Sequence, residues 1–280
     1  MQPVPKRWDN RWQFEHLPPK SELPTMYDLP SEDPEEPGLP DDFHLLQPRL
    51  LRETFQPDPV LVGEFYTAAD INLYYDPAHT NRYKRPDWLV VLGVPQVSDQ
   101  SQLRLSYVIW QEEIAPYLIV ELLSPGTEQE DLGTRVRDIE QPPRKWDVYE
   151  RYLQVPYYAT YSRYTNELRP FGLVAGRYRR LDRKEVPVAD RQGLWLPEAG
   201  IGLGVWSGAY EGVRGEWLRF FDTAGQWLPC QSERLAQETQ RAEQEAQRAE
   251  QEAQRAEQET RRAERLAQQL RALGIDPDES

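Results

Sequence analysis

The chain has 280 residues, with 47 acidic against 33 basic side chains and a formal net charge of −14 at pH 7. Its single cysteine, Cys230, excludes an intrachain disulfide and a cysteine-based zinc site, and three scattered histidines argue against a histidine cluster. Any bound metal is therefore expected to have oxygen ligands. No apolar run approaches the roughly 20 residues that span a bilayer, so we expect a soluble cytoplasmic protein without membrane partners.

The first 40 residues are predicted to form an extended arm rather than a domain. They are rich in proline and acidic residues and show neither helical nor strand periodicity. Directly afterwards, Asp41 and Asp42 can cap a helix, since leucines and Phe43 follow at helical spacing up to Phe55. The folded region is expected to begin with this helix.

Short apolar segments bounded by turn residues then predict a sheet. The expected strands are 71–75, 88–94, 103–110 and 117–123, followed by a helix over 144–153, a strand over 157–161 and a hairpin of 168–174 with 178–181. The segments that start at Trp88 and Tyr117 are apolar without alternation, which is typical of strands covered on both faces. Residues 41–185 are therefore predicted to form an α/β (α+β) domain, a mixed central β-sheet flanked by helices.

Two further regions follow this domain. Residues 186–232 are dense in Gly and Trp and are predicted to add short strands and turns on the core, with no long element. Over 233–273 the pattern Arg-Ala-Glu-Gln-Glu-Ala-Gln repeats every seven residues, and its alanine-rich a and d positions predict a long coiled-coil helix before a short tail, 274–280. A homodimer through this helix and a single solvated helix are both open.

Glu121 is the most unusual side chain because it lies inside an apolar strand segment. An ionised carboxylate in a core costs several kcal/mol unless it is paired or binds a metal. Asp87 stands at the head of another apolar segment, so the two carboxylates can meet at one end of the sheet and bind a hard divalent cation. Lys145, in the next helix, would then stabilise charge on a phosphoryl group. The structural alternative is a buried ion pair of Glu121 with Arg104, Arg135 or Lys145.

Five segments, taken in order, carry a family resemblance: Arg85-Pro-Asp-Trp-Leu-Val-Val, Val120-Glu-Leu-Leu-Ser-Pro-Gly-Thr-Glu, Asp131, Lys145 with Tyr149, and Val155-Pro-Tyr-Tyr-Ala-Thr-Tyr. Over residues 41–185 the chain resembles the Uma-type restriction endonuclease domain, a branch of the PD-(D/E)xK nuclease superfamily. The resemblance implies a restriction-endonuclease-like core that hydrolyses phosphodiester bonds of nucleic acid, expected to be DNA. It also implies Mg²⁺ or Mn²⁺ bound by Asp87 and Glu121, with the Leu122 carbonyl as a third ligand.

The resemblance has one departure, because the superfamily pattern places a lysine where this chain has Leu123. By resemblance Lys145 replaces it as the catalytic lysine, and Tyr149, four residues on, shares its helix face. Core packing with a satisfied hydroxyl is the alternative role of Tyr149. Asp131 and His44, which lies on the first helix, are expected to support the site.

The charge distribution limits how such a protein could hold nucleic acid. No region is basic overall, so strong nonspecific DNA binding is not expected. Locally, Arg82, Lys84 and Arg85 precede Asp87 and are expected to contact phosphates. Together with Leu123, the acidic balance leaves an alternative function, a catalytically inactive nuclease-fold protein that acts as an interaction and assembly module through its coiled-coil tail.

Overall fold

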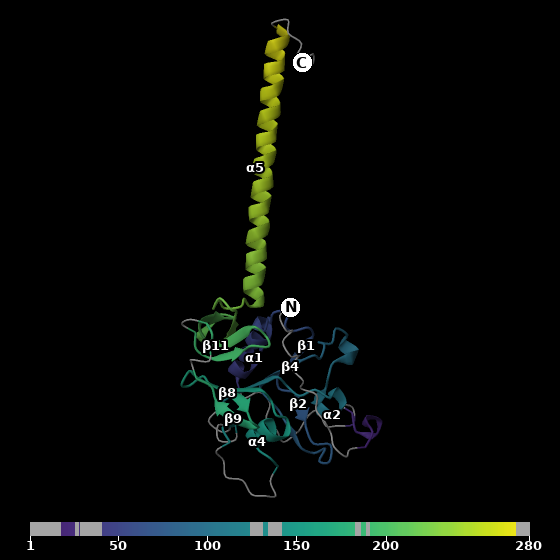
Figure 1. Cartoon of the computed structure of the whole chain (residues 1–280). Coiled ribbons are helices and arrows are strands. Elements are labelled where there is room, and N and C mark those ends of the chain that lie inside the picture. Colours follow the sequence, from purple (N-terminus) through teal and green to yellow (C-terminus); the bar gives the residue numbers. More distant parts are fainter. Residues whose placement is uncertain are drawn as a thin grey trace, which may run out of the picture. The chain divides into compact units, whose positions relative to one another are not determined.

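The structure, a computed structural model, describes residues 18–25, 28, 41–123, 131–133, 142–182, 186–188 and 191–272. The chain divides into two compact units, Met1–Leu228 and Pro229–Ser280. In its described residues the first unit combines helices with three β-sheets, and the second contains one long helix (Figure 1). Most of the predicted arm, 1–40, lies outside the described residues.

The largest sheet has six strands in the order β1-β4-β6-β7-β8-β9. Only the pair β6 and β7 is parallel among its five neighbouring pairs, so the predicted mixed central sheet is confirmed. All five residues of β6 and the first four of β4 are buried, as their unbroken apolar sequences indicate. The strands are β1 (Phe65–Ala68), β4 (Trp88–Leu92), β6 (Leu118–Leu122), β7 (Tyr157–Ser162), β8 (Glu167–Val174) and β9 (Arg177–Arg180).

The first helix, α1 (Asp42–Thr54), joins the main sheet region to the later part of the unit. Asp41 caps it, with Oδ1 accepting from the His44 N–H at 3.2 Å. Leu50 and Leu51 are fully buried. The buried amide of Gln47 forms two hydrogen bonds of 2.8 Å with the backbone of Leu218, one in each direction. These contacts bind α1 to strand β12 (Val213–Phe221).

The helix predicted over 144–153 is present, but most of it is wider than an α-helix. A short α4 (Lys145–Asp147) continues into a π-helix, η3 (Val148–Tyr152). Leu153 N–H donates to the Val148 carbonyl at 2.9 Å, the i to i+5 bond of a π-turn. Val148, Tyr149 and Leu153 pack into the main core cluster. The π-turn contains one residue more than an α-helical turn, and the burial of these apolar side chains stabilises it.

A small sheet of order β3-β2-β5 lies beside the main one. Its strands are β2 (Asn72–Tyr74), β3 (Tyr83–Lys84) and β5 (Ser106–Val108). The predicted strand 103–110 is too long at both ends. The observed strand β5 begins only at Ser106, a few residues after η2 (Gln100–Gln102), and α2 (Ile109–Glu112) begins directly after it. The Trp110 indole N–H donates to the Pro24 carbonyl at 2.8 Å, so the segment after η1 (Lys20–Glu22) is attached at α2.

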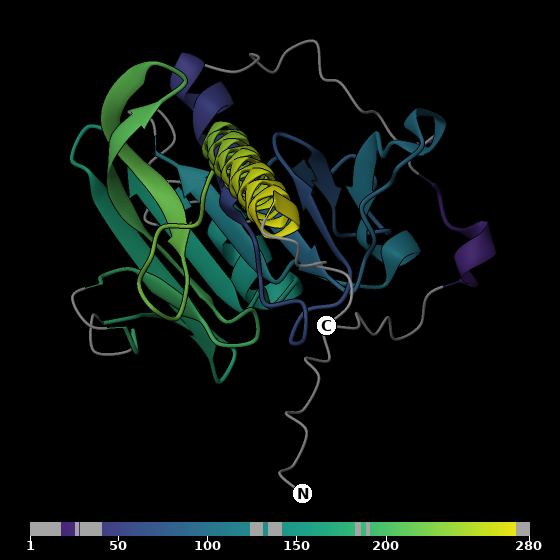
Figure 2. The same cartoon turned by 90° about the horizontal axis from the view of Figure 1, so that it is seen from above.

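The third sheet corrects the expectation that 186–232 contains no long element. Strands β11 (Ile201–Tyr210) and β12 form a long hairpin, with β10 (Leu194–Leu196) on its other edge. Glycines inside β11 hide its alternation in the sequence, and the turn is made by Glu211 and Gly212, both at positive φ. This sheet and the small sheet lie on opposite sides of the first unit (Figure 2).

The second unit is formed by α5 (Gln231–Ala272), 42 residues long. It starts two residues before the predicted 233, where the Glu233 carboxylate accepts from the Cys230 N–H at 2.9 Å and caps the first turn. No residue of α5 is buried. Among the described helices, none combines the length and apolar character needed to cross a membrane.

Candidate functional site

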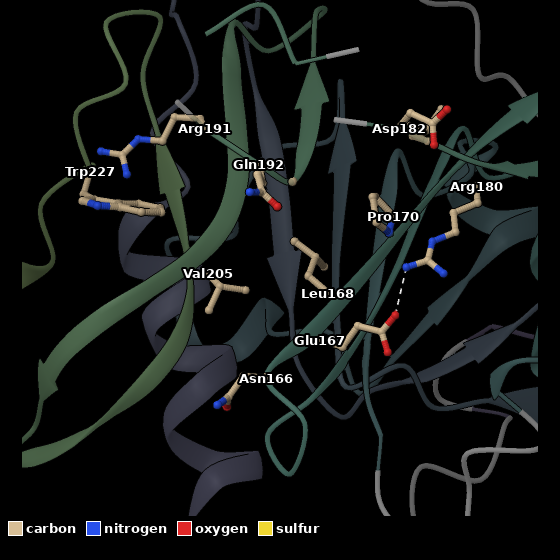
Figure 3. Close-up of a pocket in the computed structure, with 12 residues that line it drawn as sticks. Asn166, Glu167, Leu168, Pro170, Arg180, Asp182, Arg191, Gln192, Val205 and Trp227 are labelled. Atoms are coloured by element: carbon tan, nitrogen blue, oxygen red, sulfur yellow. Dashed lines mark hydrogen bonds and ion pairs between the residues drawn. The ribbon is translucent and has the colours of Figure 1, made fainter. Parts of the chain in front are cut away.

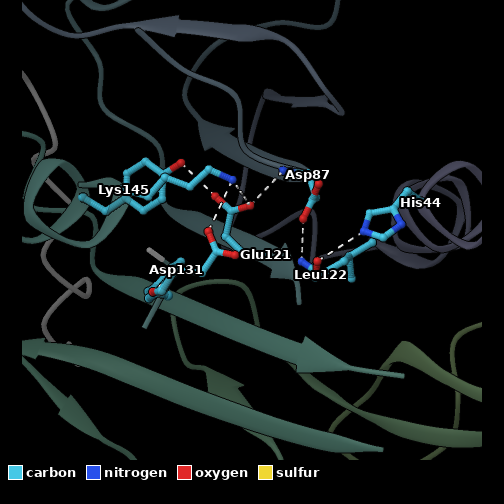
Figure 4. Close-up of polar contacts among 8 residues, drawn as sticks. His44, Asp87, Glu121, Leu122, Asp131 and Lys145 are labelled. Atoms are coloured by element: carbon cyan, nitrogen blue, oxygen red, sulfur yellow. Dashed lines mark hydrogen bonds and ion pairs between the residues drawn. The ribbon is translucent and has the colours of Figure 1, made fainter. Parts of the chain in front are cut away.

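Glu121 occupies the centre of a hydrogen-bonded cluster at the end of β6 (Figure 4). Its side chain is 0 % exposed. Oε1 accepts from the Tyr149 hydroxyl at 2.8 Å, and Oε2 accepts from Lys145 Nζ at 3.0 Å and from the Asp87 N–H at 3.3 Å. Each oxygen of this buried carboxylate thus has at least one donor, which lowers the cost of placing it in the core.

Asp87 is placed beside Glu121 by strand pairing. It directly precedes β4, which pairs antiparallel with β6 so that Trp88 lies opposite Val120. Asp87 Oδ2 accepts from the Leu122 N–H at 2.5 Å. The two carboxylates that the sequence predicts at one sheet end are therefore brought together by the structure.

Lys145 and Tyr149 both reach Glu121 from the helical segment α4–η3. The predicted shared face is thus present: Lys145 begins α4, and Tyr149 lies in the π-helix that follows it. Of the ion-pair partners that the sequence allows for Glu121, Lys145 is the one found. Arg104 instead binds both carboxylate oxygens of Glu112, at 2.7 and 3.2 Å, and Arg135 lies outside the described residues.

Asp131 contributes a third carboxylate to the cluster. Its Oδ1 lies 3.4 Å from Lys145 Nζ, and its side chain is buried. The backbone is fixed from β7, since the Tyr158 hydroxyl donates to the Asp131 carbonyl at 2.9 Å. Asp131 thus contacts Lys145, the ion-pair partner of Glu121, from a different segment of the chain.

His44 approaches the cluster from α1 on the far side of Leu122 (Figure 4). Its Nε2 donates to the Leu122 carbonyl at 3.2 Å, and its Nδ1 lies 3.0 Å from Asp41 Oδ1. His44 therefore connects the Asp41 cap of α1 to the Leu122 carbonyl. Burial raises the pKa of Asp41, but hydrogen bonds from His44 and the charge of Arg163 outweigh it and the pKa is lowered.

Arg163 is a neighbour of this site that the sequence analysis did not identify. It follows β7 directly, and β7 runs parallel to β6, so Arg163 lies at the same end of the sheet as Leu122. Its guanidinium is 2.7 Å from Asp41 and lies over the Phe43 ring. The available signal was its position at the carboxyl end of a buried strand, where binding residues gather in α/β sheets.

The charged side chains of the cluster are the acids Glu121, Asp87 and Asp131 and the ammonium group of Lys145. Burial raises the pKa of Glu121 well above its ordinary value, Lys145 opposes the shift, and Asp87 and Asp131 add to it. Burial alone would lower the pKa of Lys145, but Glu121, Asp131 and Asp87 raise it well above normal. Lys145 is therefore charged. Among the described residues, the carboxylates of Glu121 and Asp131 contact the Lys145 ammonium, and the Asp87 carboxylate binds the neighbouring Leu122 N–H.

The donor set fits a hard divalent cation. Carboxylate oxygens and a backbone carbonyl are the ligands that Mg²⁺ and Mn²⁺ prefer, and a divalent cation would balance the two negative charges left when all three acids are ionised. In the part of the chain that the structure describes, no group of three His, Cys, Asp or Glu side chains is placed to hold a metal ion. The oxygens that the resemblance implies as ligands are those of Asp87, Glu121 and the Leu122 carbonyl, and the last two are hydrogen-bonded within the cluster.

The basic residues that are expected to contact phosphates, Arg82, Lys84 and Arg85, differ in exposure and in their contacts. Arg85 donates to Asp70 at 2.7 Å. Arg82 and Lys84 are partly exposed on the segment that leads to Asp87. Arg180, on β9, pairs with Glu167 at 2.9 Å. That pair borders a separate cleft of about 800 Å³, which also contains Arg191 and Trp227 and none of the predicted site residues (Figure 3).

The comparisons with known proteins agree with this architecture. The family model Uma2, described as "Putative restriction endonuclease", matches residues 12–204. A search of curated proteins finds no match to the chain. The predicted restriction-endonuclease-like α+β fold is confirmed by the family match together with the mixed sheet. Because the match covers more than half of the chain, the protein belongs to the Uma2 family.

Proposed function

We propose that the protein is a divalent-metal-dependent endonuclease that hydrolyses phosphodiester bonds of nucleic acid, with DNA as the expected substrate. One observation carries the proposal: Asp87, Asp131 and Lys145, from three separate segments, converge around the buried carboxylate of Glu121. The chain's membership of a restriction endonuclease family supports the same reaction class.

Asp87, Glu121 and the Leu122 carbonyl would hold Mg²⁺ or Mn²⁺. The cation would supply Lewis-acid activation of the scissile phosphate and of water. The protein prepares these oxygens in advance, since Tyr149 fixes Glu121, the Leu122 N–H fixes Asp87, and His44 fixes the Leu122 carbonyl. Such preorganisation lowers the cost of assembling the site when substrate binds.

Lys145 is the group that would act on the substrate. Its ammonium is charged and belongs to the cluster, and 18 % of its side chain is accessible. A cation in this position stabilises negative charge that develops on the phosphoryl oxygens. Lys145 thus takes the role that the superfamily pattern gives to the position of Leu123.

Substrate phosphates would be bound by basic side chains around this sheet end. Arg82 and Lys84 precede Asp87, and Arg163 follows the strand beside β6. Arg85 and Arg163 already pair with Asp70 and Asp41, so each would have to share its guanidinium with the phosphate. With so few basic groups, binding is expected to be weak and to fall with added salt.

The test is calorimetric titration of Mg²⁺ and Mn²⁺ into wild type and Glu121→Gln, followed by plasmid nicking with both proteins. Wild type is expected to bind and nick, and Glu121→Gln to lose at least about 100-fold in nicking rate with weakened metal binding. Glu150→Gln is the matched control. Glu150 is also a buried glutamate of this region, but it binds Arg177 and the Tyr178 N–H.

Two outcomes would contradict the proposal: wild type that binds neither metal, or Glu121→Gln that nicks like wild type while Glu150→Gln does not. The first outcome favours the alternative, an inactive nuclease-fold protein that assembles through its tail. The observation behind that alternative is α5, in which no residue of the alanine seam is buried.

A further inference from the structure

The contacts of Glu121 show that its oxygen Oε2 is already occupied. Oε2 accepts from both Lys145 Nζ, at 3.0 Å, and the Asp87 N–H, at 3.3 Å, while Oε1 is held by Tyr149. The side chain has no exposed surface. A divalent cation that binds Glu121 through Oε2 therefore meets the lysine ammonium at the same oxygen.

Two cations in direct contact with one carboxylate oxygen repel each other strongly in a poorly solvated site. The ammonium has a flexible four-carbon stem and a second acid within reach, since Asp131 Oδ1 lies 3.4 Å away. Asp131 itself is fixed, because its side chain is buried and its carbonyl is bound by Tyr158. The lysine can thus leave Glu121 without losing a carboxylate partner.

We propose that Lys145 is the counter-ion of Glu121 in the metal-free protein, that a divalent cation displaces it from Glu121, and that Asp131 then retains it in the site. Asp131 is in this view a positioning residue for Lys145. The inference rests on the proposed metal site, but it concerns only which cation contacts Glu121 before and after a metal binds.

The experiment is a double-mutant cycle on Mn²⁺ affinity, measured by calorimetry with the full chain. Lys145→Gln removes the competing ammonium and is expected to bind Mn²⁺ at least about tenfold more tightly than wild type. Asp131→Asn leaves the displaced ammonium without its second partner and is expected to bind about tenfold more weakly. In the double variant the Asp131 substitution should have little further effect, because no ammonium remains to be retained.

Arg144→Gln is the charge-matched control. Arg144 precedes Lys145 but binds Asp147 and the Gly133 carbonyl instead of the cluster. Its removal is expected to change Mn²⁺ affinity by less than about threefold, which separates direct competition from a general loss of positive charge. Should Lys145→Gln fail to fold, Lys145→Met, of similar length and without charge, serves the same comparison.

The outcomes separate the two proposals. Wild type that binds no Mn²⁺ contradicts the proposed function. Binding to wild type with unchanged affinity in Lys145→Gln overturns the counter-ion inference alone. Equal losses from Asp131→Asn with and without Lys145 would make Asp131 a metal ligand and would overturn its positioning role.

Discussion

Acidic side chains behave in opposite ways in the two units of this protein. In the first unit Glu121, Asp87 and Asp131 are close together, and Glu121 and Asp131 are buried, each with identified donors or an identified cation. In α5 glutamates recur in every heptad, and no residue of the helix is buried. The comparison teaches that the environment, and not the number of acids, decides whether a carboxylate needs specific partners.

The same comparison explains why net charge was a poor guide to this protein. Much of the negative charge lies on exposed surfaces such as α5, where water and salt screen it. The charges that decide chemistry are the few at the end of β6. An overall value of −14 therefore says little about the site.

Removing one donor from the buried carboxylate should have the largest effect on stability. Tyr149→Phe deletes the hydroxyl that donates to Glu121 Oε1 and leaves that oxygen unsatisfied, so the free energy of unfolding is expected to fall by about 1–3 kcal/mol. Urea denaturation measures the change. Tyr152→Phe is the control, because Tyr152 is on the same π-helix but 42 % exposed. Equal effects of the two substitutions would show that the Glu121 contact contributes nothing specific.

The pH dependence of stability should expose the same carboxylate. Since the pKa of Glu121 is raised in the folded state, folding favours its protonated form. This contribution is complete below the ordinary pKa of 4.5 and is lost as the pH rises through the raised folded value. Its slope is at most about 1.4 kcal/mol per pH unit for one proton. Unfolding measured from pH 4.5 to 8 should thus give a flatter profile for Glu121→Gln, and identical profiles would contradict the buried-acid description.

The smallest effects are expected in α5. Its alanine seam is flanked on both sides by glutamates, at 243, 250 and 257 on one side and at 245, 252 and 259 on the other. Two copies paired through the seam would oppose these like charges, so wild type should sediment mainly as a monomer at neutral pH.

Neutralising one row of these glutamates tests that expectation. Glu243→Gln, Glu250→Gln and Glu257→Gln together should change unfolding of the first unit by less than about 0.5 kcal/mol while shifting sedimentation towards dimer. Arg241→Gln, Arg248→Gln and Arg255→Gln alter as many charges outside the flanking rows and should not shift it. A stable wild-type dimer at neutral pH would show that the flanking charges do not control pairing.

The sequence predicted the central strands and the pairing of Asp87 with Glu121 because both follow from short-range patterns. An unbroken apolar run identifies a covered strand, and a charge inside such a run has few allowed explanations. The residue pattern alone left Arg104 open as an ion-pair partner of Glu121, since the pairing of Arg104 with Glu112 is seen only in the fold.

Other features of the fold could not be predicted from the sequence, and each has a physical reason. The long β11–β12 hairpin was missed because Gly202, Gly204 and Gly208 carry no side chain to show alternation. The π-turn of η3 depends on how Val148 and Tyr149 pack on the sheet, which no helical periodicity records. Arg163 was missed because its partner, Asp41, lies on a segment that only the fold brings close.

The route by which Lys145 reaches Glu121, across 24 residues of sequence, bears on how relatives are sorted. A text pattern that demands lysine two positions after the acid would discard this chain at Leu123, although an ammonium stands 3.0 Å from the carboxylate. Patterns for such proteins should leave the spacing between acid and lysine free and ask for a lysine at the start of a later helix with tyrosine four residues on. Relatives without lysine at the position of Leu123 can then be separated into those that have a lysine at the position of Lys145 and those that have none.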